Sequence, residues 1–188
     1  MRGMHVLFRT LLILLRARRR RRVSLFESAD ITLRALPTDV DVLMHINNGQ
    51  YFSLFDLGRY DLMARSGFWK ATRKKGWHPV VQAEQITFRK SVTFWTKFQI
   101  HTKLIGVDDR CFYLEHRVVV DGEIYVRAYV AGRLIGPDGP VPIEEILGLA
   151  AEIGHPAPAD FEVSDDIKTW RAQSALPAAR RPAPHAGF

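Results

Sequence analysis

An acidic loop stands directly before a predicted helix start, an arrangement that suits acyl transfer. Asn47 is a good N-cap residue, and Gln50, three residues later, completes a capping-box-like pair. The first N–H groups of a helix lack partners and carry partial positive charge, so the amides of Asn48 and Gly49 can stabilise a developing oxyanion. Asp41 lies upstream on the loop, where its carboxylate can activate water as a general base or attack a carbonyl carbon itself.

These residues also suit structural roles that need no chemistry. Asp39 is predicted to serve a loop turn, and Asp41, taken without its surroundings, suits a turn equally well. His45 suits a loop histidine that hydrogen-bonds to the backbone, and Asn47 is first of all a helix cap. The residue types alone leave the catalytic and structural interpretations of Asp41 and His45 open.

A second group of polar side chains lies on a predicted strand. Glu84 and Gln82 share the parity of the apolar residues Val80 and Ile86. Polar residues on an apolar face either line a pocket or mark a solvent-facing strand end. Both interpretations of Glu84 and Gln82 remain.

Hydrophobic periodicity predicts one long helix followed by an antiparallel sheet. A helix is predicted from 47 to about 65, ending at Gly67, because its apolar positions follow helical spacing. A short strand at 31–36 precedes it, and 68–76 forms either a short second helix or a basic loop. Four strands follow, at 80–89, 92–104, 111–120 and 123–135. This order predicts an α+β fold in which the sheet packs against the long helix.

The distribution of charge excludes one class of partner. The net charge is +7, but residues 1–22 hold eight Arg and no acidic residue, so the rest of the chain holds 19 basic and 20 acidic side chains. A nucleic-acid-binding domain carries its positive charge on the folded surface, and we therefore expect no nucleic acid partner. Cys111 is the single cysteine, so neither a disulfide within the chain nor a structural zinc site is expected.

Composition divides the chain into three predicted segments. They are an apolar and polybasic extension over 1–24, a main domain over 25–153 and a Pro/Ala-rich tail over 154–188. The main domain is expected to end with a short helix at 142–153. The tail is expected to hold one helical turn near 165–171, and 175–188 to be disordered.

The N-terminal extension is predicted to hold the protein against the cytoplasmic face of a membrane without spanning it. Met4–Leu15 as a helix covers about 18 Å, against roughly 30 Å of hydrocarbon. An interfacial helix lets Arg9 reach the headgroups while the six Arg between 16 and 22 meet anionic lipid. The side chains then buried in lipid are Val6, Leu7, Leu11, Leu14 and Leu15. A mitochondrial transit peptide is the alternative, because Arg is abundant and the first acidic residue is Glu27.

Two stretches of the chain resemble the hotdog-fold thioesterases. Residues 39–51 (DVDVLMHINNGQY) match the pattern D-x-D-x-x-x-H-V-N-N-x-x-Y that precedes the long central helix of that family. The match is especially close to the acyl-ACP thioesterases and to the proteins called thioesterase superfamily member six, which also share the pattern seen here at 106–117 (GVDDRCFYLEHR). The resemblance covers roughly residues 30–170. It implies a hotdog fold, in which a curved antiparallel sheet of about five strands wraps one long helix.

The resemblance also implies an activity, the hydrolysis of acyl-CoA or a similar acyl thioester. Asp41 is implied as base or nucleophile, and His45 as the residue that orients, protonates or assists the leaving thiolate. Asn48 and Gly49 are then the oxyanion donors, and no metal or redox cofactor is implied. Family members resemble one another in forming homodimers with active sites at the seam, so Glu84 of one subunit is expected to act beside Asp41 of the other.

Substrate binding is assigned to three further residues. Gln82 is expected to line the pocket, and the charges of Arg89 and Lys90 suit the phosphates of coenzyme A, although solvated strand edges explain them as well. One position departs from the family, because acyl-ACP thioesterases carry Asn where this chain has Leu43. That departure favours the alternative function, a catalytically silent, membrane-associated protein that binds lipid or acyl-CoA, or acts as a scaffold, and retains the fold.

Overall fold

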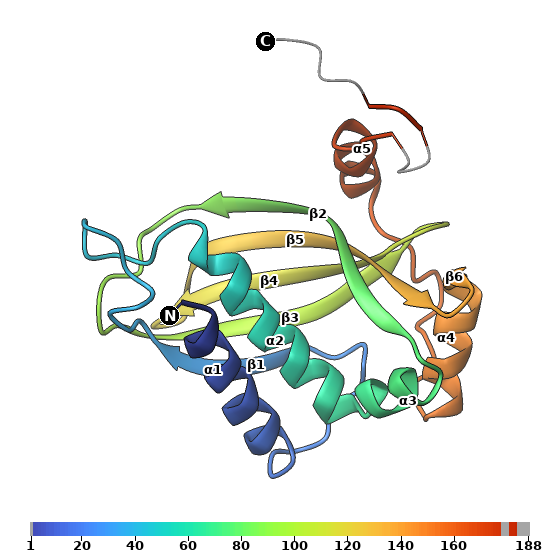
Figure 1. Ribbon diagram of the computed structural model, residues 1–188, viewed down its shortest axis with the longest axis horizontal. Helices are drawn as coiled ribbons and strands as arrows, with labels where there is room; N and C mark the ends of the chain where they lie inside the picture. Colours follow the sequence, from blue (N-terminus) through green and yellow to red (C-terminus); the bar gives the residue numbers. More distant parts are fainter. Residues whose placement is uncertain (1, 178–180, 184–188) are drawn as a thin grey trace.

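A long helix, α2 (Gln50–Ser66), lies against one face of a curved antiparallel sheet in the computed structural model, which describes residues 2–177 and 181–183 (Figure 1). Among these residues the strand order is β1-β3-β4-β5-β2, with β6 beside β5. The strands are β1 (Ala29–Arg34), β2 (His78–Phe88), β3 (Lys97–Val107), β4 (Phe112–Val120), β5 (Glu123–Gly136) and β6 (Gly139–Pro140). The other helices are α1 (Arg2–Ala17), α3 (Phe68–Lys74), α4 (Ile143–Glu152) and α5 (Asp165–Gln173). The predicted α+β fold with one helix wrapped by the sheet is confirmed.

The core lies between α2 and the sheet. The first half of α2 buries Tyr51 and Phe55 against the sheet, and its second half buries Leu62 in a neighbouring cluster that also contains residues of α4. Between the two halves, a Cβ on Gly58 would stand 2.3 Å from the hydroxyl oxygen of Thr102 on β3. The absence of a side chain at Gly58 therefore lets the helix approach the sheet closely.

One predicted strand begins later than expected. The alternation over 92–104 is confirmed from Lys97 onward, where Phe98 and Ile100 are buried. Residues 92–96 form a loop instead, in which Trp95 has a φ of 66°, outside the extended region. The alternation of apolar residues extended into this loop because Val92 is buried there. The Val92 carbonyl oxygen accepts a hydrogen bond from the Ile46 N–H at 2.8 Å.

The helix α1 packs on α2 through one face. These contacts contradict the prediction that Arg9 reaches the lipid headgroups. Ile13 and Ala17 are buried, and so is Arg9, which pairs with Asp39 at 2.8 Å instead of reaching outward. Arg20 likewise contacts carboxylates of the protein, those of Asp30 and Asp61. A buried guanidinium needs a carboxylate partner, and the fold supplies one that local sequence patterns could not reveal.

The opposite face of α1 is apolar and open to solvent. The exposed residues are Leu7, Phe8, Leu11 and Leu15, whereas Leu14 is half-buried and the side chain of Val6 lies outside the described ones. In the described part of the chain, every helix is too short or too polar to cross a membrane. Contact with a membrane surface stays a prediction.

The C-terminal segment returns to the sheet. Ile167 and Trp170 of α5 pack with Tyr113 and Ala131 in a cluster separate from the one beneath α2. The short helix predicted at 142–153 is α4, the helical turn near 165–171 is part of α5, and 68–74 is helical. Residues 175–188 were predicted to be disordered, and 178–180 and 184–188 of them lie outside the described residues. The division of the chain into three segments stays a prediction.

Candidate active site

The loop that carries the two aspartates is closed at its base by backbone hydrogen bonds. The Asn47 N–H donates to the Asp39 carbonyl oxygen at 2.9 Å, and the Asp41 N–H donates to the His45 carbonyl oxygen at 3.0 Å. Met44 at the tip has a φ of 59°, which turns the chain back. The loop is thus a small, tied hairpin that presents Asp41 and His45 on neighbouring positions.

Asp41 and His45 lie close together and partly open to solvent. Asp41 Oδ1 is 3.6 Å from His45 Nδ1, and each side chain is about a quarter exposed. Asp41 Oδ1 also accepts a hydrogen bond from the Leu43 N–H at 2.9 Å, which fixes the carboxylate in an Asx-type turn. The turn role and the catalytic role, which the sequence left open, are compatible because the Asp41 side chain performs the first with one oxygen.

The predicted oxyanion donors differ in availability. The Gly49 N–H already donates to Asn47 Oδ1 at 2.9 Å, so its assignment as a free donor is wrong in this conformation. The predicted N-cap and capping-box roles of Asn47 are wrong, because α2 begins at Gln50 with Gly49 at its N-cap position and no side-chain cap hydrogen bond. The Asn47 side chain instead accepts the Gly49 N–H in an Asx-type turn before the helix. Within the described residues, no partner is recorded for the Asn48 N–H, and Asn48 is exposed. Asn48 is therefore the donor that remains from the predicted pair.

A second loop lies against the first and enlarges the site. Phe94 N–H donates to the Met44 carbonyl oxygen at 2.8 Å, and His45 pairs with Thr93. Together the two loops expose an apolar patch, which we call the tip patch and which consists of Val42, Leu43, Met44, Phe94 and Trp95. Sequence reasoning missed this patch because Phe94 was assigned to a strand.

Glu84 belongs to a different polar cluster. Its carboxylate Oε1 is 3.5 Å from the Arg59 guanidinium, which also contacts Asp56 on the same helix. Burial raises the pKa of Glu84, while the Arg59 charge opposes this shift. No ion pair or hydrogen bond recorded within the described residues joins Glu84 to Asp41 or His45. Glu84 thus lines a partly buried polar site, but within one chain it stands apart from Asp41.

Arg59 reaches deeper still, to a fully buried histidine. Arg59 Nη1 lies 3.3 Å from His116 Nε2, and Thr102 Oγ1 lies 2.9 Å from His116 Nδ1. Because a guanidinium only donates, Nε2 is the acceptor and Nδ1 carries the proton that it donates to Thr102. The imidazole also stacks on Phe55, with ring centroids 4.8 Å apart. Burial, with a smaller contribution from Arg59, holds the pKa of His116 well below its ordinary value.

The buried histidine predicts a pH-dependent stability. Below about pH 6.5, His116 is protonated in the unfolded chain but not in the folded chain. The free energy of unfolding therefore decreases as the pH is lowered, by up to ~1.4 kcal/mol per pH unit. The raised pKa values of Glu84 and Asp61 act in the opposite direction as the pH falls further, so the slope just below pH 6.5 is the one to compare. Urea unfolding should show this slope in the wild type and lose it in His116→Gln. An equal slope in both proteins would contradict the assignment, and His78→Gln, an exposed histidine, is the control.

The residues assigned to substrate binding are placed at the end and the edge of the sheet. Arg89 and Lys90 both contact the carboxylate of Glu123, at 2.7 and 2.6 Å, so two positive charges share one negative charge. Gln82 lies at a β-bulge between Val81 and Ala83 and is exposed. Gln82 was assigned to the pocket because regular alternation places it on the same strand face as Val80 and Ile86. The bulge interrupts that alternation, so Gln82 is a surface residue here.

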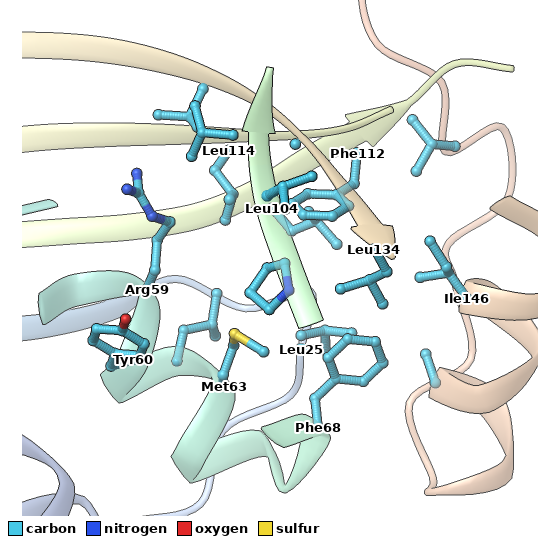
Figure 2. Close-up of a pocket in the computed structure, with 18 of the residues that line it drawn as sticks. Leu25, Arg59, Tyr60, Met63, Phe68, Leu104, Phe112, Leu114, Leu134 and Ile146 are labelled. Carbon is cyan, nitrogen blue, oxygen red and sulfur yellow. The ribbon is translucent and has the colours of Figure 1, made fainter. Parts of the chain in front are cut away.

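An apolar cavity of ≈ 140 Å³ lies between the second half of α2 and the strands β2 to β5 (Figure 2). Segments outside the helix-and-sheet frame close it, with Leu25 from the segment before β1, Phe68 from α3 and Ile146 from α4. Arg59 and Tyr60 stand together at one side of the cavity, as Figure 2 shows. The cavity therefore combines an apolar interior with a polar side that belongs to the Glu84 cluster.

The tip patch and the cavity lie toward opposite ends of α2. Arg59 stands nine positions after Gln50, which corresponds to about 14 Å along a helix. In Figure 1 the loop before α2 lies at the far end of that helix from α3 and α4. Among the described residues there is no group of three or more His, Cys, Asp or Glu side chains placed to hold a metal ion.

The family follows from a match over more than half of the chain. Residues 35–146 match the family model described as the thioesterase-like superfamily. The chain belongs to that superfamily. Its relatives include Protein THEM6 of Xenopus laevis, 36% identical over 98 residues that make up 52% of this chain and 47% of the relative. Protein THEM6 of Danio rerio is 31% identical over 100 residues, 53% of this chain and 50% of the relative. The matches thus span about half the length of these relatives.

Solved structures of thioesterases share the hotdog fold of this superfamily member. The probable thioesterase YbaW from Escherichia coli has a TM-score of 0.62 at 17% identity, over 67% of this chain and 98% of that one. The DHNA-CoA thioesterase from Staphylococcus aureus has a TM-score of 0.60 at 15% identity, over 79% and 96%. The BH1999 gentisyl-coenzyme A thioesterase has a TM-score of 0.57 at 16% identity, over 64% and 99%. At these identities the likeness concerns the fold.

Proposed function

We propose that the protein hydrolyses acyl-CoA or a related acyl thioester at the loop that carries Asp41. The observation that carries the proposal is the pairing of the Asp41 carboxylate with the His45 imidazole, 3.6 Å apart, on the loop that leads into α2. Membership of the thioesterase-like superfamily supports thioester chemistry. Structural neighbours whose names specify CoA thioesterases support a CoA carrier.

The chemistry needs a base, an oxyanion donor and a proton for the leaving group. In the proposed step, water attacks the thioester carbonyl carbon as Asp41 takes its proton, and the Asn48 N–H stabilises the oxyanion. The carbon–sulfur bond then breaks, and His45 assists the departing thiolate by supplying a proton. Direct attack by Asp41 is the other route, which passes through an anhydride that water hydrolyses.

The cavity supports an apolar acyl group as the part of the substrate that is held away from solvent. Apolar cavities of about 150 Å³ bind a molecule the size of benzene, so ≈ 140 Å³ accommodates about six carbon atoms. In one chain the cavity and Asp41 lie toward opposite ends of α2, so a second copy would have to bring them together. The proposal therefore includes a homodimer.

Two surfaces support the homodimer. β2 is an edge of the described sheet, so the hydrogen-bonding groups on its outer side are available to another strand. The tip patch adds exposed apolar area next to Asp41, of the kind that subunit contacts bury. Sedimentation velocity at micromolar concentration should give a species of about twice 21.5 kDa. A single species at the monomer mass would contradict this arrangement.

One observation favours the silent binding protein instead. Leu43 is 71% exposed and lies between Asp41 and His45, where the related acyl-ACP thioesterases carry a polar residue. Asp41 Oδ1 already accepts the Leu43 N–H, so one of the two carboxylate oxygens serves the turn. This protein would bind acyl-CoA in the same cavity without turnover.

A panel of acyl-CoA substrates separates the two functions. Purified full-length protein is incubated with acyl-CoAs of increasing chain length, and released CoA is followed with a thiol-reactive dye. Hydrolysis that saturates with substrate supports the enzyme. Saturable binding of the same acyl-CoAs without released thiol supports the silent protein and contradicts the proposed hydrolase.

A further inference from the structure

The N-terminal helix is tied to the candidate active-site loop by one buried ion pair. Arg9 Nη1 donates to both carboxylate oxygens of Asp39, at 2.8 and 2.9 Å, and Arg9 Nη2 donates to the Arg34 carbonyl oxygen at 3.0 Å. The Asp39 side chain has no exposed surface, and that of Arg9 is 10% exposed. The guanidinium thus spans α1, the end of β1 and the first aspartate of the loop.

Asp39 passes this restraint to the loop itself. Its carboxylate also accepts the Leu36 N–H at 2.9 Å, and its carbonyl oxygen accepts the Asn47 N–H that closes the loop. Asp39 therefore holds both ends of the segment that contains Asp41 and His45. Arg9 lies outside the residues 35–146 that match the superfamily, so the restraint comes from a segment that the family match does not cover.

We propose that Arg9 is a positioning residue for the proposed thioester hydrolysis, acting through Asp39 to hold the Asp41–His45 loop in its active geometry. The inference rests on the proposed function. Arg9 touches neither Asp41 nor His45 in any recorded contact of the described residues, so it acts by restraint alone. Positioning of this kind matters because displacement of a catalytic group by about 1 Å can cost a hundredfold in rate.

Kinetic measurements on full-length Arg9→Met test the proposal. We expect kcat for acyl-CoA hydrolysis, per folded molecule, to fall at least tenfold while KM changes less than threefold. Arg9→Lys keeps the charge but loses the paired donors, so it should recover part of the lost kcat. The double variant Arg9→Met/Asp39→Asn removes the unpaired buried carboxylate, and it should recover thermal stability while kcat stays low.

Arg20→Met is the matched control. Arg20 lies just beyond the same helix and contacts the Asp30 and Asp61 carboxylates, but none of its contacts involves the loop. It should leave kcat per folded molecule unchanged. If Arg9→Met also leaves kcat unchanged, or if kcat in the double variant recovers together with stability, Arg9 is only structural and the proposal is overturned.

Hydrogen exchange keeps this test separate from the proposed function. In Arg9→Met, the amides of Asp41 and Asn47, which close the loop, should exchange at least tenfold faster, while those of β4 stay protected. If the wild-type protein shows no turnover but Arg9→Met exchanges faster, the proposed hydrolase is rejected and the restraint of the loop by Arg9 and Asp39 is retained. Unchanged exchange of the Asp41 and Asn47 amides in Arg9→Met would overturn the proposal that the Arg9–Asp39 pair restrains the loop.

Discussion

Asp41→Asn is expected to lower kcat for acyl-CoA hydrolysis by a factor of 100 or more with little change in stability. A general base contributes about 10²–10⁴ to a rate, and an amide can neither take a proton from water nor attack as a carboxylate does. Asn keeps an oxygen that accepts the Leu43 N–H, so the turn should persist. Initial rates with a thiol-reactive dye, beside thermal melts of the same samples, measure both effects.

The control for this substitution is Asp109→Asn. Asp109 is highly exposed, and its recorded contact is with the adjacent Arg110, so the same loss of charge there should leave turnover intact. His45→Ala should reduce kcat less than Asp41→Asn, because water can replace part of its role in protonating the thiolate. Turnover near the wild-type rate in Asp41→Asn would reject the mechanism proposed for this loop.

Gly58→Val is expected to destabilise the fold by about 3 kcal/mol or more, and Gly58→Ala by about 1–3 kcal/mol. A Cβ at Gly58 would stand 2.3 Å from Thr102 Oγ1 and 3.4 Å from a methyl carbon of Ile100. Thr102 cannot rotate away cheaply, because its hydroxyl is the partner of the buried His116 Nδ1. The helix must therefore move off the sheet. Urea unfolding monitored by circular dichroism measures the loss.

Gly148→Ala supplies the comparison, because it is also a glycine within a helix. A Cβ there meets no atom within 4 Å, and alanine is favoured over glycine in a helix interior by about 1 kcal/mol. Gly148→Ala should thus stabilise the protein slightly. If Gly58→Ala were as stable as the wild type, the close approach of α2 to β3 would be wrong.

The sequence predicted the elements better than the contacts between them. The spacing of Tyr51, Phe55 and Leu62 identified α2, because helical periodicity is a local property of the chain. The Arg9–Asp39 pair joins residues thirty positions apart, and no local pattern records such a contact. Likewise, alternation predicted a buried face for β3, but not that its polar member Thr102 would find His116 on the next strand.

The assignment of Gly49 as an oxyanion donor failed for a reason that can be stated in general terms. A side chain that turns back onto the backbone and a substrate oxyanion compete for the same N–H groups. Asn47 was predicted as the helix cap and Gly49 as a donor, yet the Asn47 side chain accepts the Gly49 N–H. Neither prediction holds as made, because Gly49 itself occupies the N-cap position and its N–H is used within the turn before α2.

The two halves of β2 differ in their capacity to recruit a foreign strand. Near its start, Pro79 lacks an N–H and the bulge at Gln82 breaks the register, which are features that discourage aggregation at a sheet edge. The half from Ala83 to Phe88 (AEQITF) lacks both features, and it is long enough to template an intermolecular sheet. A chain kept monomeric would leave the outer backbone groups of this half open to another strand, so a homodimer that covers this half would protect solubility as well as assemble a site.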